Sequence, residues 1–179
     1  MPFRFERTEI PDVVIVEARA FSDGRGMFKE TFKKSDFEVF GIPTEFVQDN
    51  VSRSQKNVIR GLHFQREPYT QGKLVGVMKG AVLDIAVDLR KDSQTHGKYV
   101  SAKLSDENNR MLWVPPGFAH GFLALEESIV HYKVTNEYNK DSEGGIIWND
   151  PFVKVNWPID HPLLSEKDMI WGTSKGVYL

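Results

Sequence analysis

The sequence predicts an all-β fold, a β-sandwich or barrel of the jelly-roll type with short peripheral helices. Two observations support this prediction. Ten short runs rich in β-branched and aromatic residues follow one another along the 179-residue chain, and Gly, Pro, Asn and Asp separate them. Successive short strands without intervening helices are typical of sandwiches and barrels, and a jelly roll is the commonest such shape that also encloses a ligand cavity.

The expected strands are spread over most of the chain. They cover residues 13–16, 27–32, 45–51, 58–65, 73–77, 81–89, 98–104, 111–114, 121–125 and 129–134. Lys79-Gly80 and the segment Asp106–Asn109 predict tight hairpins, because Gly and Asn tolerate positive φ, so we expect antiparallel neighbours on either side of each. A helix is expected only over Lys34–Phe40, with Ser35 as its cap, and a further turn over Ser165–Trp171.

We expect a single domain over residues 1–179, because this length suits one hydrophobic core. After Trp148-Asn149-Asp150-Pro151 the sequence contains more Pro and loses its periodicity. The C-terminal section is therefore expected to wrap over the barrel, from where it can deliver a side chain to a cavity.

Composition argues against several classes of protein. A formal net charge of -2 and a pI of about 6.2 give no overall positive field, so nucleic acid and anionic membranes are not expected partners. No stretch approaches the roughly 18 apolar residues of a membrane span, and Met1–Phe5 does not begin a secretory apolar run, so we expect a cytoplasmic location. The chain has no cysteine, which excludes disulfides, thiolate catalysis and thiolate metal ligands.

The segment Arg60-Gly61-Leu62-His63-Phe64-Gln65, followed by Lys73, concentrates reactive side chains on neighbouring extended segments. An imidazole that titrates near neutral pH beside two cations is the beginning of an active site. Strict alternation places His63 and Gln65 on one face of their strand and Arg60 on the other, unless a bulge intervenes.

Alternation also sorts polar residues on other strands. Gln48 and Asn50 share a face, and two carboxamides so placed suit a planar base or a sugar, although exposed sheet faces carry such pairs as well. Asp84 and Asp88 share a face too, and either acid can line a cavity or be solvated. For Asp88 we expect solvation.

A rigid turn precedes His120 in the segment Pro115–Phe122. The spacing Pro-x-Gly-x-x-His resembles the second sequence signature of the cupins, in which the histidine is a metal ligand. The companion signature, His-x-His followed by Glu, is absent, because Phe64 and Gln65 follow His63. We therefore expect no metal site and no metal dependence.

An ordered set of segments resembles the dTDP-4-dehydrorhamnose 3,5-epimerase family, cofactor-free cupin enzymes of deoxysugar nucleotide metabolism. The resemblance runs nearly from end to end. It rests on Asp23–Phe28 with Glu30, Gln48–Asn50, Arg60–Phe64, Gln71–Leu74, Asp84–Arg90, Gly117–Leu125, Tyr132 with Tyr138, Trp148–Pro151 and Ser165–Asp168.

The resemblance implies tasks for individual residues. His63 is then the base and Asp168 its partner. Tyr132 is the acid, and Lys73 lies near the substrate ketone. Contacts to nucleotide or sugar are implied for Arg25, Phe28, Glu30, Gln48, Asn50, Arg60, His120, Tyr138, Glu143 and Lys167. The resemblance further implies no cofactor, and a homodimer in which N-terminal residues of one subunit complete the nucleotide site of the other.

These residue types suit removal of a proton next to a ketone, which produces an enolate. Histidine, with an ordinary pKa of about 6.5, accepts a proton near neutral pH, a lysine ammonium stabilises the oxyanion, and tyrosine, with an ordinary pKa of about 10, is a protonated donor. Arg25 and Arg60 suit the diphosphate, because guanidinium groups bind phosphate oxygens in pairs. Together with this chemistry, the resemblance implies inversion of C3 and C5 of dTDP-4-dehydro-6-deoxy-D-glucose to give dTDP-4-dehydro-L-rhamnose, in dTDP-L-rhamnose biosynthesis.

Other functions remain open at this point. A single-position epimerase or a keto-isomerase of the same superfamily shares the fold and the dTDP site. A metal-dependent cupin enzyme and a non-catalytic nucleotide-sugar binding protein are the remaining alternatives. The sequence also leaves open whether Asp168 or Asp84 is the partner of His63.

Overall fold

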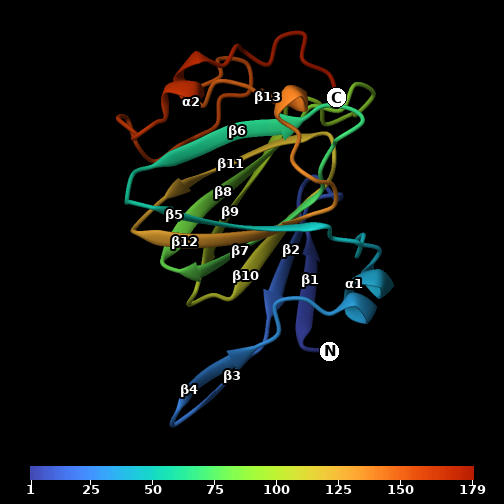
Figure 1. The fold of residues 1–179 in the computed structure, drawn as a ribbon, viewed down its shortest axis with the longest axis vertical. Coiled ribbons are helices and arrows are strands. Elements are labelled where there is room, and N and C mark those ends of the chain that lie inside the picture. Colours follow the sequence, from blue (N-terminus) through green and yellow to red (C-terminus); the bar gives the residue numbers. More distant parts are fainter.

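The computed structural model describes residues 1–179 and consists of two antiparallel sheets that form a sandwich (Figure 1). The first sheet contains, in spatial order, β1 (Phe3–Arg7), β2 (Val14–Ala18), β10 (Arg110–Val114), β7 (Lys73–Lys79), β12 (Ser128–Val134) and β5 (Gln48–Ser54). The second contains β13 (Glu143–Gly145), β6 (Ile59–Gln65), β11 (Phe118–Ala124), β8 (Ala81–Asp88) and β9 (Tyr99–Ser105). The predicted all-β jelly-roll architecture is confirmed.

Four further elements lie outside the two sheets. A hairpin of β3 (Ala20–Asp23) and β4 (Gly26–Lys29) projects from the sandwich (Figure 1). The helices are α1 (Lys34–Phe40) and α2 (Glu166–Ile170), and one 3-10 turn covers Lys140–Ser142. Neither helix has the length and apolar character needed to cross a membrane.

Every predicted strand has a counterpart, with ends that shift by up to three residues. Three short strands, β1, β3 and β13, are additional. β1 has the sequence Phe-Arg-Phe-Glu-Arg and lies at a sheet edge, and β13 is Glu-Gly-Gly. Pairing to a neighbouring strand, rather than local β-propensity, makes the Glu-Gly-Gly segment extended.

The predicted helix over Lys34–Phe40 is confirmed, but its predicted cap is wrong. The residue at the N-cap is Lys33, which makes no side-chain cap hydrogen bond, and Ser35 lies inside the first turn. In α2, by contrast, the Ser165 side chain accepts a hydrogen bond from the backbone N–H of Asp168. This cap fixes the carboxylate-bearing residue at the start of α2.

The two predicted hairpins are also wrong. Lys79-Gly80 joins β7 to β8 and Asp106–Asn109 joins β9 to β10, yet each pair of strands is divided between the two sheets. The chain does reverse sharply, with positive φ at Gly80 and Asn109. Turn chemistry specifies a reversal, whereas packing decides whether the returning strand continues the same sheet or begins the other.

Apolar side chains from both sheets fill much of the space between them, including Val75, Val77, Val82, Leu104, Leu112, Phe118 and Phe122. A second cluster lies where Val153, Val155 and Trp157 of the C-terminal section pack with residues such as Ile59 and Leu62 of β6. The C-terminal section therefore buries apolar surface against the five-stranded sheet, over which it passes in Figure 1.

Candidate active site

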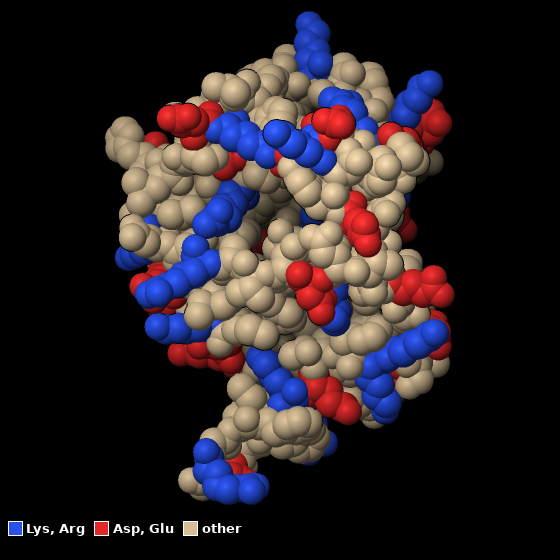
Figure 2. Space-filling model, in the orientation of Figure 1, with Lys and Arg blue, Asp and Glu red and all other residues tan.

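A cavity of about 500 Å³ lies between the two sheets. Figure 2 shows the surface hollowed here, with Lys and Arg side chains at the rim. The six-stranded sheet contributes residues of β5, β7 and β12, and the other sheet contributes residues of β6, β11 and β13. Most of the predicted site residues line the cavity: Gln48, Asn50, Arg60, His63, Lys73, His120, Tyr132, Tyr138, Glu143, Lys167 and Asp168.

Arg60 and His63 both reach the cavity because β6 contains a bulge. The register of β6 against β11 shifts so that Gly121 lies opposite two residues of β6, and the extra residue reverses the alternation. Glycine is needed at this point, because φ of Gly61 is 129° and a Cβ there would lie 2.6 Å from the Cα of Gly121. The bulge thus brings Arg60 to the same cavity as the imidazole.

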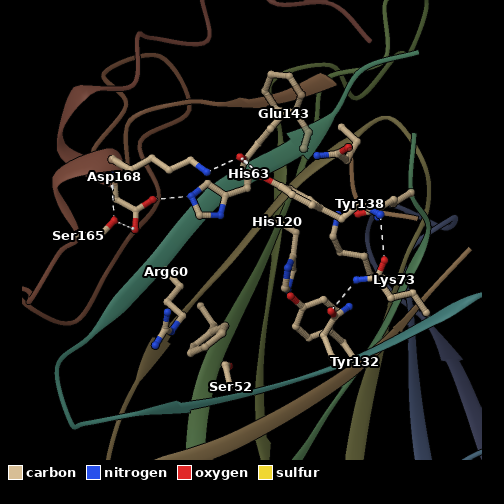
Figure 3. A pocket seen from close by; sticks show the side chains of 17 residues that line it. Ser52, Arg60, His63, Lys73, His120, Tyr132, Tyr138, Glu143, Ser165 and Asp168 are labelled. Carbon is tan, nitrogen blue, oxygen red and sulfur yellow. Dashed lines mark hydrogen bonds and ion pairs between the residues drawn. The ribbon is translucent and has the colours of Figure 1, made fainter. Parts of the chain in front are cut away.

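His63 is paired with Asp168, as Figure 3 shows. One oxygen of the buried Asp168 carboxylate contacts Nε2 of His63, and the other accepts a hydrogen bond of 2.8 Å from the Ser165 hydroxyl. Burial disfavours the ionised form, but the hydrogen bond and charge of His63, together with Ser165, outweigh burial and lower the pKa of Asp168. The His63 ring is therefore held at one nitrogen while part of its surface faces the cavity.

Asp84 is paired with His120 instead. Nε2 of His120 donates a hydrogen bond of 2.8 Å to Asp84, and both side chains are buried. Lys73 lines the same cavity from the opposite sheet. Burial lowers the pKa of Lys73 to about 8, and attraction to the Asp84 carboxylate limits the decrease. The lysine amine is thus mostly protonated at neutral pH and begins to lose its charge just above it.

Tyr132 enters the cavity from β12, in the sheet opposite the one that carries His63 (Figure 3). Burial raises the pKa of its hydroxyl above the ordinary value, and attraction to Arg60 offsets only part of that increase. The hydroxyl is therefore a proton donor at neutral pH, placed on the other wall from the imidazole.

Four of the predicted contact residues interact with one another. Glu143 accepts a hydrogen bond of 2.8 Å from the Tyr138 hydroxyl and forms an ion pair with Lys167. Burial opposes ionisation of Glu143, but the hydrogen bonds of Lys167 and Tyr138 outweigh it and lower its pKa. The Gln48 side chain accepts from the backbone N–H of Tyr138 at 2.9 Å. These contacts link three distant segments beside the cavity.

Three predicted contact residues lie away from this cavity. Arg25 and Phe28 belong to the projecting β3–β4 hairpin, and Glu30 follows it directly (Figure 1). Arg25 is paired with Asp23 on the hairpin, and 66% of Phe28 is exposed. Within one chain, therefore, the hairpin residues and the cavity residues do not meet.

The prediction that Asp88 is solvated is wrong. Its side chain is fully buried on β8 and accepts hydrogen bonds from Arg90, Ser93 and Thr95. Burial would raise its pKa, but these hydrogen bonds outweigh burial and lower the pKa to about 2. The loop that follows the strand folds back over the carboxylate, a contact that strand alternation cannot predict.

Six residues that line the cavity were not predicted: Ser52, Phe64, Gln65, Gln71, Phe122 and Ser165. Ser52 continues the alternation of Gln48 and Asn50 along β5, so extension of that pattern would have found it. Ser165 has no comparable signal, because only the return of the C-terminal section brings it to the cavity. No group of three or more His, Asp and Glu side chains is arranged to hold a metal ion.

Comparison with known proteins agrees with the geometry. A family model described as dTDP-4-dehydrorhamnose 3,5-epimerase matches residues 7–175. The chain is 53% identical over 165 residues to the dTDP-4-dehydrorhamnose 3,5-epimerase of Shigella flexneri, and the match covers 91% of each protein. The fold is similar to the crystal structure of dTDP-4-dehydrorhamnose 3,5-epimerase from Sulfolobus tokodaii, with a TM-score of 0.93, 46% identity and 99% of each chain covered.

A second solved structure is similar and contains a ligand. It is the dTDP-6-deoxy-D-glucose-3,5-epimerase of Legionella pneumophila Philadelphia 1 in complex with dTDP-4-keto-L-rhamnose, with a TM-score of 0.93 and 43% identity. The match covers 98% of this chain and 94% of that one. On the family model, the sequence identity and the shared fold, this chain belongs to the dTDP-4-dehydrorhamnose 3,5-epimerase family.

Proposed function

We propose that this protein inverts C3 and C5 of dTDP-4-dehydro-6-deoxy-D-glucose and so produces dTDP-4-dehydro-L-rhamnose for dTDP-L-rhamnose biosynthesis. Family membership and the keto-rhamnose ligand of the Legionella relative support this reaction. The observation that carries the proposal is the His63–Asp168 pair on one wall of the cavity with Tyr132 on the other.

His63 is the base in this proposal. A proton on C3 or C5 is acidic because the C4 ketone accepts the electron pair of the broken C–H bond as an enolate. Asp168 holds the Nε2 side of the ring, which leaves Nδ1 to take the proton, and its ionised carboxylate stabilises the resulting imidazolium. The proton then returns to solvent from the partly exposed ring.

Lys73 stabilises the enolate in the next part of the proposal. Its side chain is buried at the cavity wall, and burial away from bulk water strengthens attraction to a developing oxyanion. A pKa of about 8 keeps most of this amine charged at neutral pH.

Tyr132 donates a proton to the enolate carbon from the side opposite His63, which inverts the centre. Its raised pKa keeps the hydroxyl protonated until it reacts, and solvent then reprotonates the tyrosinate. These side chains perform each proton transfer, so the proposal requires no cofactor and no metal. A cytoplasmic location is part of the same proposal, as expected for an enzyme that acts on a nucleotide sugar.

We propose further that two chains form a homodimer in which the β3–β4 hairpin of each subunit completes the nucleotide site of the other. The hairpin projects from its own sandwich and exposes Met27 and Phe28 beside Arg25 (Figure 1). Exposed apolar side chains next to a cation suit contact with a base and a phosphate. Arg60, Gln48 and Asn50 would supply the contacts from within the cavity.

Subunit mixing tests the shared site. Arg25→Ala and His63→Ala homodimers should both have low activity, whereas a co-expressed hybrid contains one cavity in which both residues are intact. Recovered activity in the purified hybrid is the expected result. A hybrid no more active than the two homodimers would show that the hairpin does not act across the dimer.

Incubation with dTDP-4-dehydro-6-deoxy-D-glucose in deuterated water, followed by NMR, tests the reaction. Deuterium at both C3 and C5 of an inverted product is the expected result. Deuterium at one carbon alone would indicate a single-position epimerase, and binding of dTDP without exchange would indicate a non-catalytic binding protein.

A further inference from the structure

The proposed reaction gives no task to Asp84, although this residue is fully buried beside the cavity. One carboxylate oxygen accepts the hydrogen bond from His120, and the other is buried with no hydrogen-bond partner. A buried carboxylate with an unsatisfied oxygen is costly, and a neutral side chain in this place would avoid that cost. Such a group calls for an explanation in terms of function.

The position of Asp84 separates it from the substrate. It lies on β8 and contacts His120 of the neighbouring strand β11, and His120, not Asp84, lines the cavity. Lys73 lines the same cavity from the opposite sheet. Lys73 and Asp84 form no direct ion pair, but the negative charge of Asp84 favours the protonated lysine amine. The carboxylate thus lies behind His120, one of the groups that line the cavity.

We infer that Asp84 is a positioning residue that orients His120 and maintains the positive charge of Lys73 where the enolate oxygen forms. The inference rests on the proposed function. A carboxylate only accepts hydrogen bonds, so it holds the proton of His120 on Nε2 and turns the other edge of the ring toward the cavity. Burial favours loss of the Lys73 proton, and the negative charge of Asp84 opposes that loss.

Several other ionisable groups line the same cavity as Lys73. They are Arg60 and His63 of β6, His120 of β11, Tyr132 of β12, Glu143 of β13, Lys167 and Asp168 of α2, and Tyr138. Asp84 differs from Glu143, whose carboxylate is paired with Lys167, because its only ion-pair partner is His120. Its charge is therefore available to Lys73.

The test is the Asp84→Asn variant of the whole enzyme, with kcat and kcat/KM measured from pH 6 to pH 10. The alkaline limb of the kcat/KM profile should shift to a pH about one unit lower, because the variant lacks the negative charge that favours protonated Lys73. At neutral pH kcat should fall about tenfold while KM changes much less, because the amide also permits the wrong tautomer of His120.

Asp88→Asn is the matched control. Asp88 lies on the same strand and is equally buried, but its partners Arg90, Ser93 and Thr95 lie outside the cavity. This variant should lower the melting temperature and leave the pH profile in place. The inference would be overturned if the alkaline limb of the kcat/KM profile did not shift in Asp84→Asn. It would also be overturned if the limb shifted as far in Asp88→Asn as in Asp84→Asn.

A measurement on the unmodified enzyme covers the case in which Asp84→Asn does not fold. Nitrogen-15 NMR of the histidine rings should find the His120 proton on Nε2 from pH 6 to pH 9, and a proton on Nδ1 alone would contradict the inference. Failure of the wild-type enzyme to epimerise would refute the proposed function. An active wild type with an unmoved limb in Asp84→Asn would refute only the task assigned to Asp84.

Discussion

Two His–Asp pairs face one cavity, and they differ in where the carboxylate comes from. His120 and Asp84 lie on adjacent strands, and only 9% of the His120 side chain is exposed. The carboxylate that pairs with His63 belongs to α2, 105 residues further along the chain, and 32% of the His63 side chain is exposed. In the proposed function His63 takes a proton from the sugar and needs an accessible ring edge, whereas Asp84 acts only through its neighbours and can be fully buried.

The comparison shows that residue type alone does not assign chemistry. Both pairs contain an imidazole joined to a carboxylate through Nε2. A partly exposed imidazole such as His63 suits proton transfer, and a nearly buried pair such as His120 and Asp84 suits orientation of neighbouring groups. Variants of the two pairs should therefore have different kinetic effects.

The largest effect is expected from His63→Ala, which should lower kcat by about a thousandfold or more, because it removes the proposed base. Binding of dTDP, measured by calorimetry, should change little. His120→Ala should lower kcat far less. Equal losses of kcat in the two variants would show that the His63–Asp168 and His120–Asp84 pairs do not differ in function.

Tyr132→Phe should separate exchange from inversion. His63 can still remove and return a proton on its own side, so in deuterated water the substrate should gain deuterium faster than inverted product forms. The loss of one hydroxyl leaves the ring packing in place. Inversion of both centres at near wild-type rate would mean that another residue, with Tyr138 the next candidate, is the acid.

Lys73 should determine the alkaline side of the pH profile. Because its pKa is about 8, the protonated fraction decreases as the pH rises through that value, and kcat/KM should fall with it. Lys73→Ala should abolish turnover at every pH while dTDP binding persists. A flat profile from pH 7 to pH 10 in the wild type would show that the charge of Lys73 is not needed.

Asp168→Asn should have a smaller effect than His63→Ala, about 10- to 100-fold in kcat, because the base is weakened and less well oriented but is still present. Steady-state kinetics beside a melting curve would separate this effect from misfolding. A loss as large as that of His63→Ala would mean that the carboxylate does more than orient the ring.

The smallest effect is expected from chelation, which should leave kcat unchanged. The predicted site residues include no His-x-His signature and no cysteine. Activity that disappears with a chelator and returns only with Fe, Mn, Ni or Zn would indicate a metal-dependent cupin enzyme.

The sequence by itself determined the features that depend on neighbouring residues. The strand runs, the helix over Lys34–Phe40 and the shared face of Gln48 and Asn50 all appear in the structure, because side-chain alternation and backbone preference act over a few residues. The resemblance to a family added the pairing of His63 with Asp168, which no local pattern contains.

Only the tertiary structure decided the features that join distant segments. The bulge at Gly61 brings Arg60 to the cavity, the loop after β8 buries Asp88, and two sharp turns carry the chain between sheets instead of forming hairpins. The Asp84–His120 contact likewise depends on which strands become neighbours. Each is decided by packing and hydrogen bonding between segments that the sequence separates, because a buried polar group takes whichever partner the completed fold places beside it.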